Sequence, residues 1–92
     1  MKYNIVITSS CKRDIKRANR QGKNIQLLFE IVDLLSDGQK LDPKYKDHKL
    51  AGKYSGMREC HIEPDFLLIY EIKKEEIILY LARVGSHSEL FD

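Results

Sequence analysis

Three short segments of this 92-residue chain hold the side chains that could carry out acid–base chemistry. Each segment contains one of the three histidines, and carboxylates, an arginine and aromatic rings lie beside them. The residues are His48, Glu59, His61, Asp65, Arg83, His87 and Phe91. Histidine can accept or donate a proton near neutral pH, and arginine keeps its charge while it binds phosphate oxygens. Metal-free cleavage of RNA needs this combination, because a base, an acid and a phosphate-binding cation all take part.

Each of these residues also has a structural interpretation. A histidine in a loop or on an open strand face could simply be exposed. Arg83 could form an ion pair with Glu59 or Glu63 across neighbouring strands, and Phe91 could fold back into the core. Asp65 follows a proline and could be only a turn residue. Residue types alone therefore do not distinguish a ribonuclease from a basic binding module.

The elements that must position these residues follow from the apolar pattern. Residues 3–8 alternate and are rich in β-branched side chains, which predicts a strand. Residues 8–10 could cap a first helix, with Asp14 expected in its first turn. Residues 21–23 break this helix, Asn24 caps a second, apolar helix, and Asp37 with Gly38 ends it. Residues 39–56 have no sustained period, so we expect a long ordered loop.

Three further strands are expected at residues 57–63, 66–72 and 77–84, with turns at 64–65 and 73–76. The fold class is therefore α+β, with element order βααβββ. We expect two helices from the N-terminal half on one face of a mostly antiparallel four-stranded sheet. Alternation places Glu59, His61 and Glu63 on the opposite, open face. It groups Arg83 with Leu79 and Leu81, and only the strand register decides which face that is.

Composition predicts one cytoplasmic domain spanning residues 1–92. Hydrophobic residues make up 42% and charged residues 33% of the chain, and no apolar run approaches the roughly 20 residues that cross a bilayer. The N-terminal apolar run is too short for a secretion signal. Basic residues dominate residues 1–24 and 37–58, so part of the surface should attract phosphate backbones or an acidic protein, unless it is merely an exposed helix face.

The two cysteines, Cys11 and Cys60, are interpreted as small buried hydrophobic residues. Cys60 and His61 are neighbours on a strand and point to opposite faces, and a structural zinc ion needs about four ligands. We therefore expect no structural metal and no small-molecule cofactor.

Three motifs resemble one known family. They are YKDHKL at residues 45–50, H-x-E-P-D at 61–65 followed by an apolar strand, and R-x-G-S-H-x-x-L-F at 83–91. The chain resembles the YafQ branch of the RelE/ParE toxin superfamily over nearly its whole length. The resemblance implies a RelE-like fold and a type II toxin that cuts mRNA in the ribosomal A site and inhibits translation. A cognate antitoxin would be its protein partner, beside mRNA and the ribosome, and no membrane would be involved.

The resemblance also implies residue roles. The catalytic group would be His48, His61, Asp65, Arg83 and His87, with Arg83 on the phosphate. The substrate contacts would be Phe91, Glu59, Phe66 and Lys46. Glu59 stands where the family commonly has Asp, and Phe66 where it commonly has Trp. Two other functions stay open: a ParE-like toxin that inhibits a protein such as gyrase without chemistry, and an RNA-binding module that does not cleave.

Overall fold

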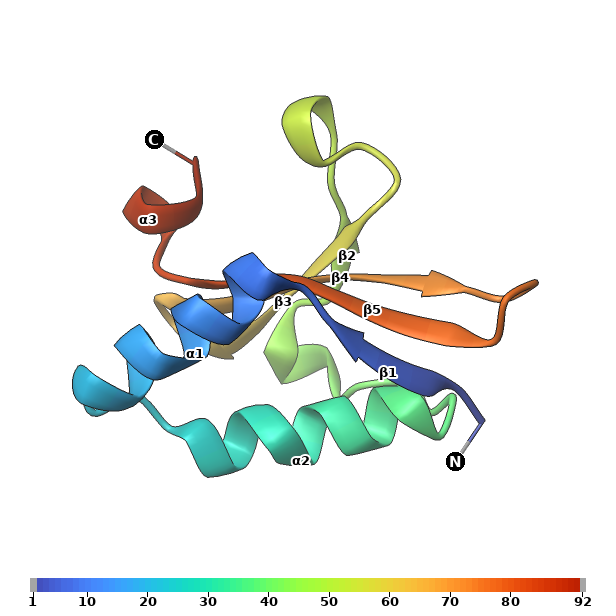
Figure 1. Cartoon of the computed structure of the whole chain (residues 1–92), viewed down its shortest axis with the longest axis horizontal. Helices are drawn as coiled ribbons and strands as arrows, with labels where there is room; N and C mark the ends of the chain where they lie inside the picture. The colour runs from blue at the N-terminus through green and yellow to red at the C-terminus, as the bar shows by residue number, and fades with distance from the viewer. Residues whose placement is uncertain (1, 92) are drawn as a thin grey trace.

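A five-stranded sheet forms the centre of the molecule, with strand order β1-β5-β4-β3-β2 (Figure 1). The strands are β1 (Asn4–Ile7), β2 (His48–Lys49), β3 (Arg58–Glu63), β4 (Phe66–Lys73) and β5 (Ile78–Gly85). β1 runs parallel to β5, and the other neighbours are antiparallel. The computed structural model describes residues 2–91 and confirms the α+β class. Its fifth strand, β2, was expected to be loop, because two residues are too few to show alternation.

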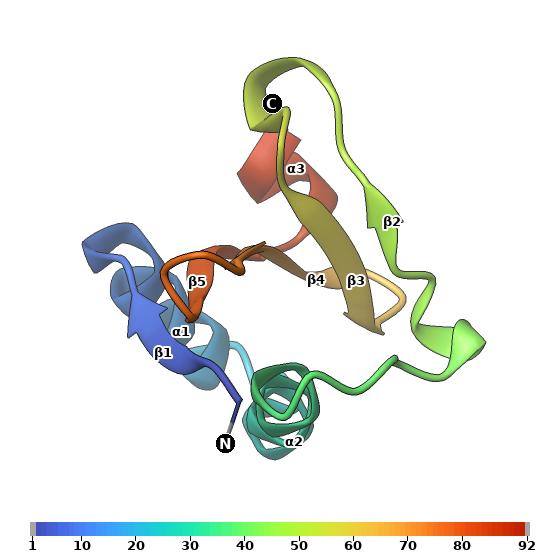
Figure 2. The same ribbon diagram turned by 90° about the vertical axis from the view of Figure 1, so that its right-hand side faces the viewer.

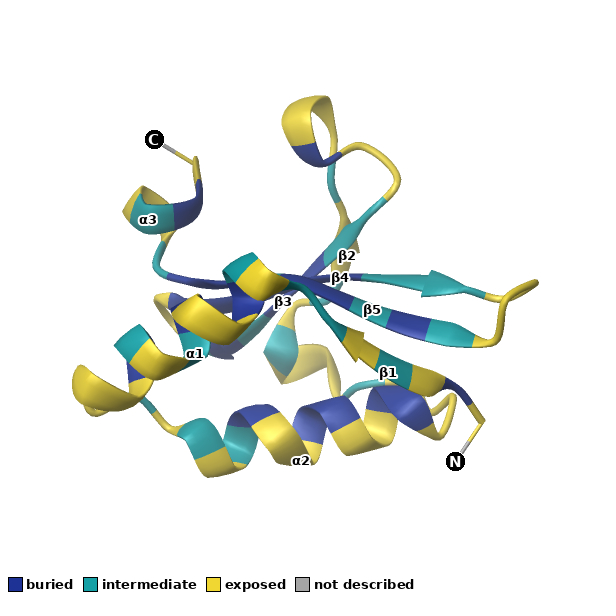
Figure 3. Cartoon of the chain, in the orientation of Figure 1, coloured by how far each residue is buried: buried dark blue, intermediate teal, exposed yellow. Residues whose placement is uncertain are grey.

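Two helices, α1 (Ser9–Arg20) and α2 (Ile25–Ser36), flank one side of this sheet (Figures 1 and 2). Thr8 caps α1 by accepting from the Cys11 amide at 2.9 Å, and Asn24 caps α2 through the Leu27 amide at 3.0 Å. α2 turns its apolar face toward the sheet (Figure 3), and its buried apolar side chains are Leu28, Ile31, Val32 and Leu35. The predicted caps and core helix are therefore confirmed.

The opposite face of the sheet is only partly open. A second hydrophobic cluster lies there, made of Tyr54, Leu67, Ile69, Ala82 and Leu90. It is covered by the turn η2 (Gly52–Tyr54) and by a short C-terminal helix, α3 (His87–Phe91), and both lie on the side away from α2 (Figures 1 and 2). A further turn, η1 (Pro43–Tyr45), precedes β2. These short elements belong to regions that have no periodic pattern, so the sequence did not predict them.

A β-bulge in β5 turns Arg83 to this second face. Leu81 pairs with Tyr70, but the next paired residue is Arg83, opposite Ile69, so Ala82 is an extra residue. Leu81 and Tyr70 belong to the helix-facing core, whereas Ile69 belongs to the second cluster. Directly opposed residues point to the same side of a sheet. Arg83 therefore does not share a face with Leu81, which corrects the strict alternation.

A second bulge, in β3, turns Glu63 away from the second face. His61 pairs with Leu67, and the next pair is Glu63 with Phe66, which leaves Ile62 as the extra residue. Glu63 thereby leaves the face of His61 and accepts a hydrogen bond from the Asn24 amide at 3.0 Å. The expectation that Glu63 lies on the open face is wrong, because the extra residue reverses the parity of the strand end.

Both cysteines lie in the core. Cys11 and Cys60 are free thiols with no exposed surface. Burial raises the pKa of the Cys11 thiol to about 12 and raises the pKa of Cys60 as well. Neither thiol ionises near neutral pH, so their interpretation as small hydrophobic residues is confirmed. None of the helices formed within residues 2–91 is long and apolar enough to span a membrane.

Candidate active site

The strand register brings candidate residues of three strands to one face of the sheet. His48 of β2 pairs with Glu59 of β3, Glu59 pairs with Ile69 of β4, and Ile69 pairs with Arg83 of β5. These residues form a row across the sheet, and His61 stands on the same face two residues after Glu59. Arg83 and His61 therefore lie on the same side of the sheet, which the sequence had left undecided.

The three imidazoles form a continuous group. The ring centroids of His48 and His61 are 6.1 Å apart, and those of His61 and His87 are 5.7 Å apart. They come from β2, β3 and α3, which are distant in the sequence. His61 is the central ring, so a substrate placed against it could contact either neighbour.

A buried carboxylate holds the first two imidazoles. Glu59 is only 4% exposed, and its Oε1 atom lies 3.1 Å from Nε2 of His61 and 3.5 Å from Nε2 of His48. Nδ1 of His48 lies 2.7 Å from the Lys46 carbonyl oxygen. Each ring nitrogen of His48 therefore faces an oxygen atom, the Glu59 carboxylate oxygen at ion-pair distance only. Glu59 was expected to contact substrate, but the structure turns its carboxylate to the histidines.

A second carboxylate holds the third imidazole at the surface. Oδ1 of Asp65 lies 2.7 Å from Nδ1 of His87 and also accepts from the His87 amide at 2.9 Å. The amide hydrogen bond, followed by the bond from the ring, lowers the pKa of the Asp65 carboxyl. Asp65 is thus a carboxylate at neutral pH, an acceptor only, so Nδ1 of His87 is the donor. Nε2 of His87 is therefore the ring nitrogen available for proton transfer.

Arg83 has a partner that the sequence did not predict. Its Nε and Nη2 atoms lie 2.6 Å and 3.1 Å from the two carboxylate oxygens of Asp14, not near Glu59 or Glu63. This hydrogen bonding raises the pKa of the Arg83 guanidinium. Asp14 was expected near the N-terminus of α1 as a dipole partner. The helix begins at Ser9, so Asp14 instead reaches the second turn, where it is 3% exposed.

An aromatic pair borders the group of imidazoles. Phe91 is 43% exposed, so it does not fold into the core; its ring centroid is 6.3 Å from that of His87 and 5.4 Å from that of Tyr54. Tyr54 donates a hydrogen bond to the Leu90 carbonyl at 2.9 Å and also contributes to the raised pKa of Arg83. Sequence reasoning missed Tyr54. Its position in an aperiodic loop gave no signal.

Two of the expected substrate contacts have different outcomes. Phe66 has no exposed surface and belongs to the helix-facing core, so it cannot contact a substrate, and that expectation is wrong. Regular alternation along β4 explains this, since Leu67 and Ile69 face the second cluster and Phe66 therefore faces the helices. Lys46 is exposed and lines a cavity of about 420 Å³ together with His61. Its position therefore suits contact with RNA beside the imidazoles.

Three of these side chains could also hold a metal ion. One ligand atom each from His48, Glu59 and His61 lies within 4.8 Å of the others. Two imidazoles and a carboxylate are ligands that zinc and copper accept. The donor set therefore fits a divalent transition-metal ion.

Comparison with known proteins assigns this chain to a family. A family model described as the bacterial toxin of type II toxin–antitoxin system, YafQ, matches residues 3–92. The chain therefore belongs to the YafQ toxin family. The mRNA interferase toxin YafQ of Escherichia coli strain K12 is 36% identical over 80 residues, which cover 86% of this chain and 85% of that protein.

Solved structures share the whole fold. The metal-bound toxin from Helicobacter pylori is 46% identical, with a TM-score of 0.90 over 97% of this chain and 99% of its own. The toxin chain in the E. coli DinJ-YafQ toxin–antitoxin complex is 32% identical, with a TM-score of 0.88 over 100% of both chains. The RelE-like fold expected from the sequence is confirmed.

Proposed function

We propose that this chain is the toxin of a type II toxin–antitoxin system and an endoribonuclease that cuts mRNA in the ribosomal A site. It would act in the cytoplasm. The observation that carries the proposal is the convergence of three imidazoles, each held by an oxygen acceptor, on one face of the sheet. The curated relative named as an mRNA interferase supports the same activity. Cleavage would stop translation by destroying the message.

Two carboxylate–imidazole pairs supply the proton transfers. One is Glu59 with His61 and the other is Asp65 with His87, and their rings are neighbours. One imidazole removes the proton from the ribose 2′-hydroxyl, whose oxygen then attacks the phosphorus atom. The other donates a proton to the 5′-oxygen as the bond from phosphorus to that oxygen breaks. The products are a 2′,3′-cyclic phosphate and a 5′-hydroxyl, and no redox partner or other reactant is needed.

Arg83 stabilises the charge that develops on the phosphate. Asp14 occupies its Nε edge, so the remaining N–H groups of the guanidinium are available to phosphate oxygens. Phe91 offers an exposed ring on which a base can stack, which is worth about 1–3 kcal/mol per base. Lys46 would bind a neighbouring phosphate. His48 lies on the other side of His61 from His87, where it could contact the same substrate.

The protein partner would be a cognate antitoxin, as in the complex of the E. coli relative. The outer face of α1 is basic and exposed, with Lys12, Arg13, Lys16 and Arg20. An acidic antitoxin segment could cover this face and block docking to ribosomal RNA, since both compete for the same charges. The structure thus offers one surface to two successive partners.

The test is cleavage of mRNA on purified ribosomes, with the 5′ ends mapped to codons. Wild-type protein should produce cuts within the A-site codon that end in a cyclic phosphate, and His87→Ala should slow their formation by about 10²–10⁴-fold. Full cutting by His87→Ala would overturn the proposal. Growth arrest by a variant lacking all three imidazoles, together with inhibited supercoiling, would support a toxin that binds a protein target instead.

A further inference from the structure

Helix α1 covers the part of β5 that β1 leaves unpaired. β1 pairs with residues 78–81 of β5, so the strand edge beyond Leu81 needs other partners. Thr8 Oγ1 donates to the Ala82 carbonyl at 2.8 Å, and the Val84 amide donates to Oδ2 of Asp14 at 3.2 Å. Two side chains of the N-terminal half thus close the edge that carries Arg83.

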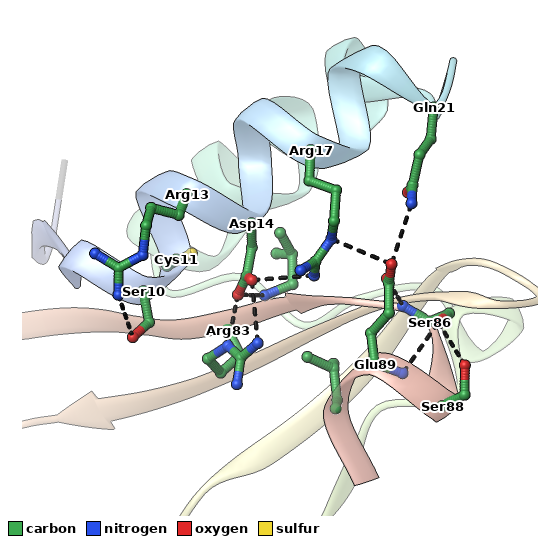
Figure 4. Close-up of polar contacts among 12 residues, drawn as sticks. Ser10, Cys11, Arg13, Asp14, Arg17, Gln21, Arg83, Ser86, Ser88 and Glu89 are labelled. Carbon is green, nitrogen blue, oxygen red and sulfur yellow. Dashed lines mark hydrogen bonds and ion pairs between the residues drawn. The ribbon is translucent and has the colours of Figure 1, made fainter. Parts of the chain in front are cut away.

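Asp14 is a buried carboxylate with several donors (Figure 4). Beside the Val84 amide it accepts from Nε and Nη2 of Arg83, at 2.6 Å and 3.1 Å, and from Nη2 of Arg17 at 3.1 Å. Closing a strand edge requires only one acceptor. The bidentate contact does more, because it fixes the plane of the Arg83 guanidinium and orients its free N–H groups.

The network continues from α1 to the short helix α3. Nε of Arg17 lies 3.1 Å from Oε2 of Glu89, as an ion pair rather than an aligned hydrogen bond, and Gln21 Nε2 donates to the same oxygen at 3.1 Å. Asp14, Arg17 and Gln21 are spaced at i, i+3 and i+7, so they lie on one face of α1. Figure 4 shows this face directed at Arg83 and Glu89.

Glu89 in turn fixes the first turn of α3. Its Oε1 accepts from the Ser86 amide at 2.9 Å, while Ser86 Oγ accepts from the Glu89 amide at 3.2 Å, which is a capping box. His87 lies inside this box, and Phe91 follows one turn later. The contact with Ser86 and then that with Gln21 lower the pKa of the Glu89 carboxyl, so it stays charged at neutral pH.

Gly85 leaves room for this crossing. A Cβ atom at position 85 would lie 2.9 Å from Glu89 Oε1 and 3.2 Å from Arg17 Nη2. A side chain at this position would force the ends of Glu89 and Arg17 to shift. The glycine of the R-x-G-S-H segment therefore lets the Arg17–Glu89 pair lie close to the strand.

We propose that Asp14, Arg17 and Glu89 are positioning residues, which hold the cation of Arg83 and the imidazole of His87 in fixed relation to one phosphate. None of the three needs to contact the RNA. The proposal rests on the proposed function, in which Arg83 and His87 act on the phosphate group. It assigns to α1 a second role, distinct from its exposed basic face.

The test measures mRNA cleavage on ribosomes by Asp14→Asn and Glu89→Gln, each alone and combined with a catalytic variant. Asp14→Asn should lower kcat on the order of 100-fold, as expected for a misplaced catalytic group, with little change in KM. It should cause no further loss in an Arg83→Ala background, and Glu89→Gln should cause none in a His87→Ala background. Asp33→Asn and Glu30→Gln, on the exposed side of α2, are the matched charge controls and should cleave like wild type.

Losses that add fully in the double variants would overturn the positioning roles, because a merely structural defect is independent of Arg83 and His87. Full cleavage by Arg83→Ala and His87→Ala would overturn the proposed function instead, so the two failures are distinguishable. If Asp14→Asn does not fold, NMR of the wild-type protein decides. The Arg83 Nε–H group should exchange slowly with solvent and its guanidinium should rotate slowly; fast exchange and rotation would contradict the clamp.

Discussion

The two carboxylate–imidazole pairs of the site are alike in chemistry and different in setting. The Glu59–His61 pair stands on β3 inside the sheet, with side chains 5% and 19% exposed. The Asp65–His87 pair joins a turn to α3 at the surface, with side chains 61% and 56% exposed. The first is fixed by strand register, whereas the second depends on side-chain contacts that reach from α1. One half of the site is therefore rigid by fold, and the other half is held by a network that single substitutions can release.

The comparison predicts that both imidazoles are indispensable despite their different burial. His61→Ala and His87→Ala should each lower the cleavage rate by about 10²–10⁴-fold, the usual contribution of general acid–base catalysis. Single-turnover assays on ribosome-bound mRNA measure this directly. His48→Ala should cost less if His48 contributes charge only. A loss confined to one of the two pairs would show that the other is structural.

Divalent metal ions should bind at the Glu59–His61 pair and not at the Asp65–His87 pair. The donor set of His48, Glu59 and His61 fits zinc or copper ions, which would compete with the contact between Glu59 and Nε2 of His61 that orients this imidazole. Added Zn²⁺ should therefore inhibit cleavage strongly, and a chelator should restore it. Calorimetry of Zn²⁺ binding should lose the site in His61→Ala but keep it in Asp65→Asn. Stimulation of cleavage by Zn²⁺ would contradict this assignment.

The pairs should also differ in their effect on stability. Glu59→Ala leaves the buried side of His61 without an acceptor, which costs about 1–3 kcal/mol. This corresponds to roughly 4–8 °C in thermal midpoint per kcal/mol for a domain of this size. Asp65→Ala removes an exposed partner and should change the midpoint little. Thermal unfolding followed by circular dichroism checks both, and equal losses would contradict the contrast in burial.

Much of this arrangement could be predicted from the sequence, because alternation and helix caps report local structure. The core helix, the caps at Thr8 and Asn24 and the candidate histidines all follow from residue patterns. The two bulges could not be predicted, since an extra residue leaves no trace in an apolar pattern. They turned Arg83 toward the site and Glu63 away from it.

Long-range polar contacts were equally hidden. Asp14 and Arg83 are far apart in the chain, and the spacing of charges along α1 did not indicate that the single acid of this helix would be buried. Tyr54 was missed because its loop has no period. Phe66 was misassigned because its role was taken from the family resemblance, whereas alternation along β4 turns it to the helices. The sequence did not indicate the strand register, which determines which side chains of neighbouring strands come into contact.

The smallest expected effect is a pH dependence in the exposed pair. The pKa of Asp65 is lowered in the folded state, so its contribution to stability is complete above its unfolded pKa of about 4. The contribution is lost as the pH falls through the lower folded pKa. The difference in thermal midpoint between wild type and Asp65→Asn should therefore shrink as the pH falls from about 5 toward 2. A difference that grows over this range would contradict the hydrogen bonds from His87.

The most direct test of the two-pair account is the pH–rate profile of mRNA cleavage. Wild-type protein should give a bell-shaped profile, because one imidazole must be neutral and the other protonated. His61→Ala and His87→Ala should each retain a slow rate and lose a different limb of the bell. Loss of the same limb in both variants, or a full bell in either, would show that the two pairs do not divide the roles of base and acid.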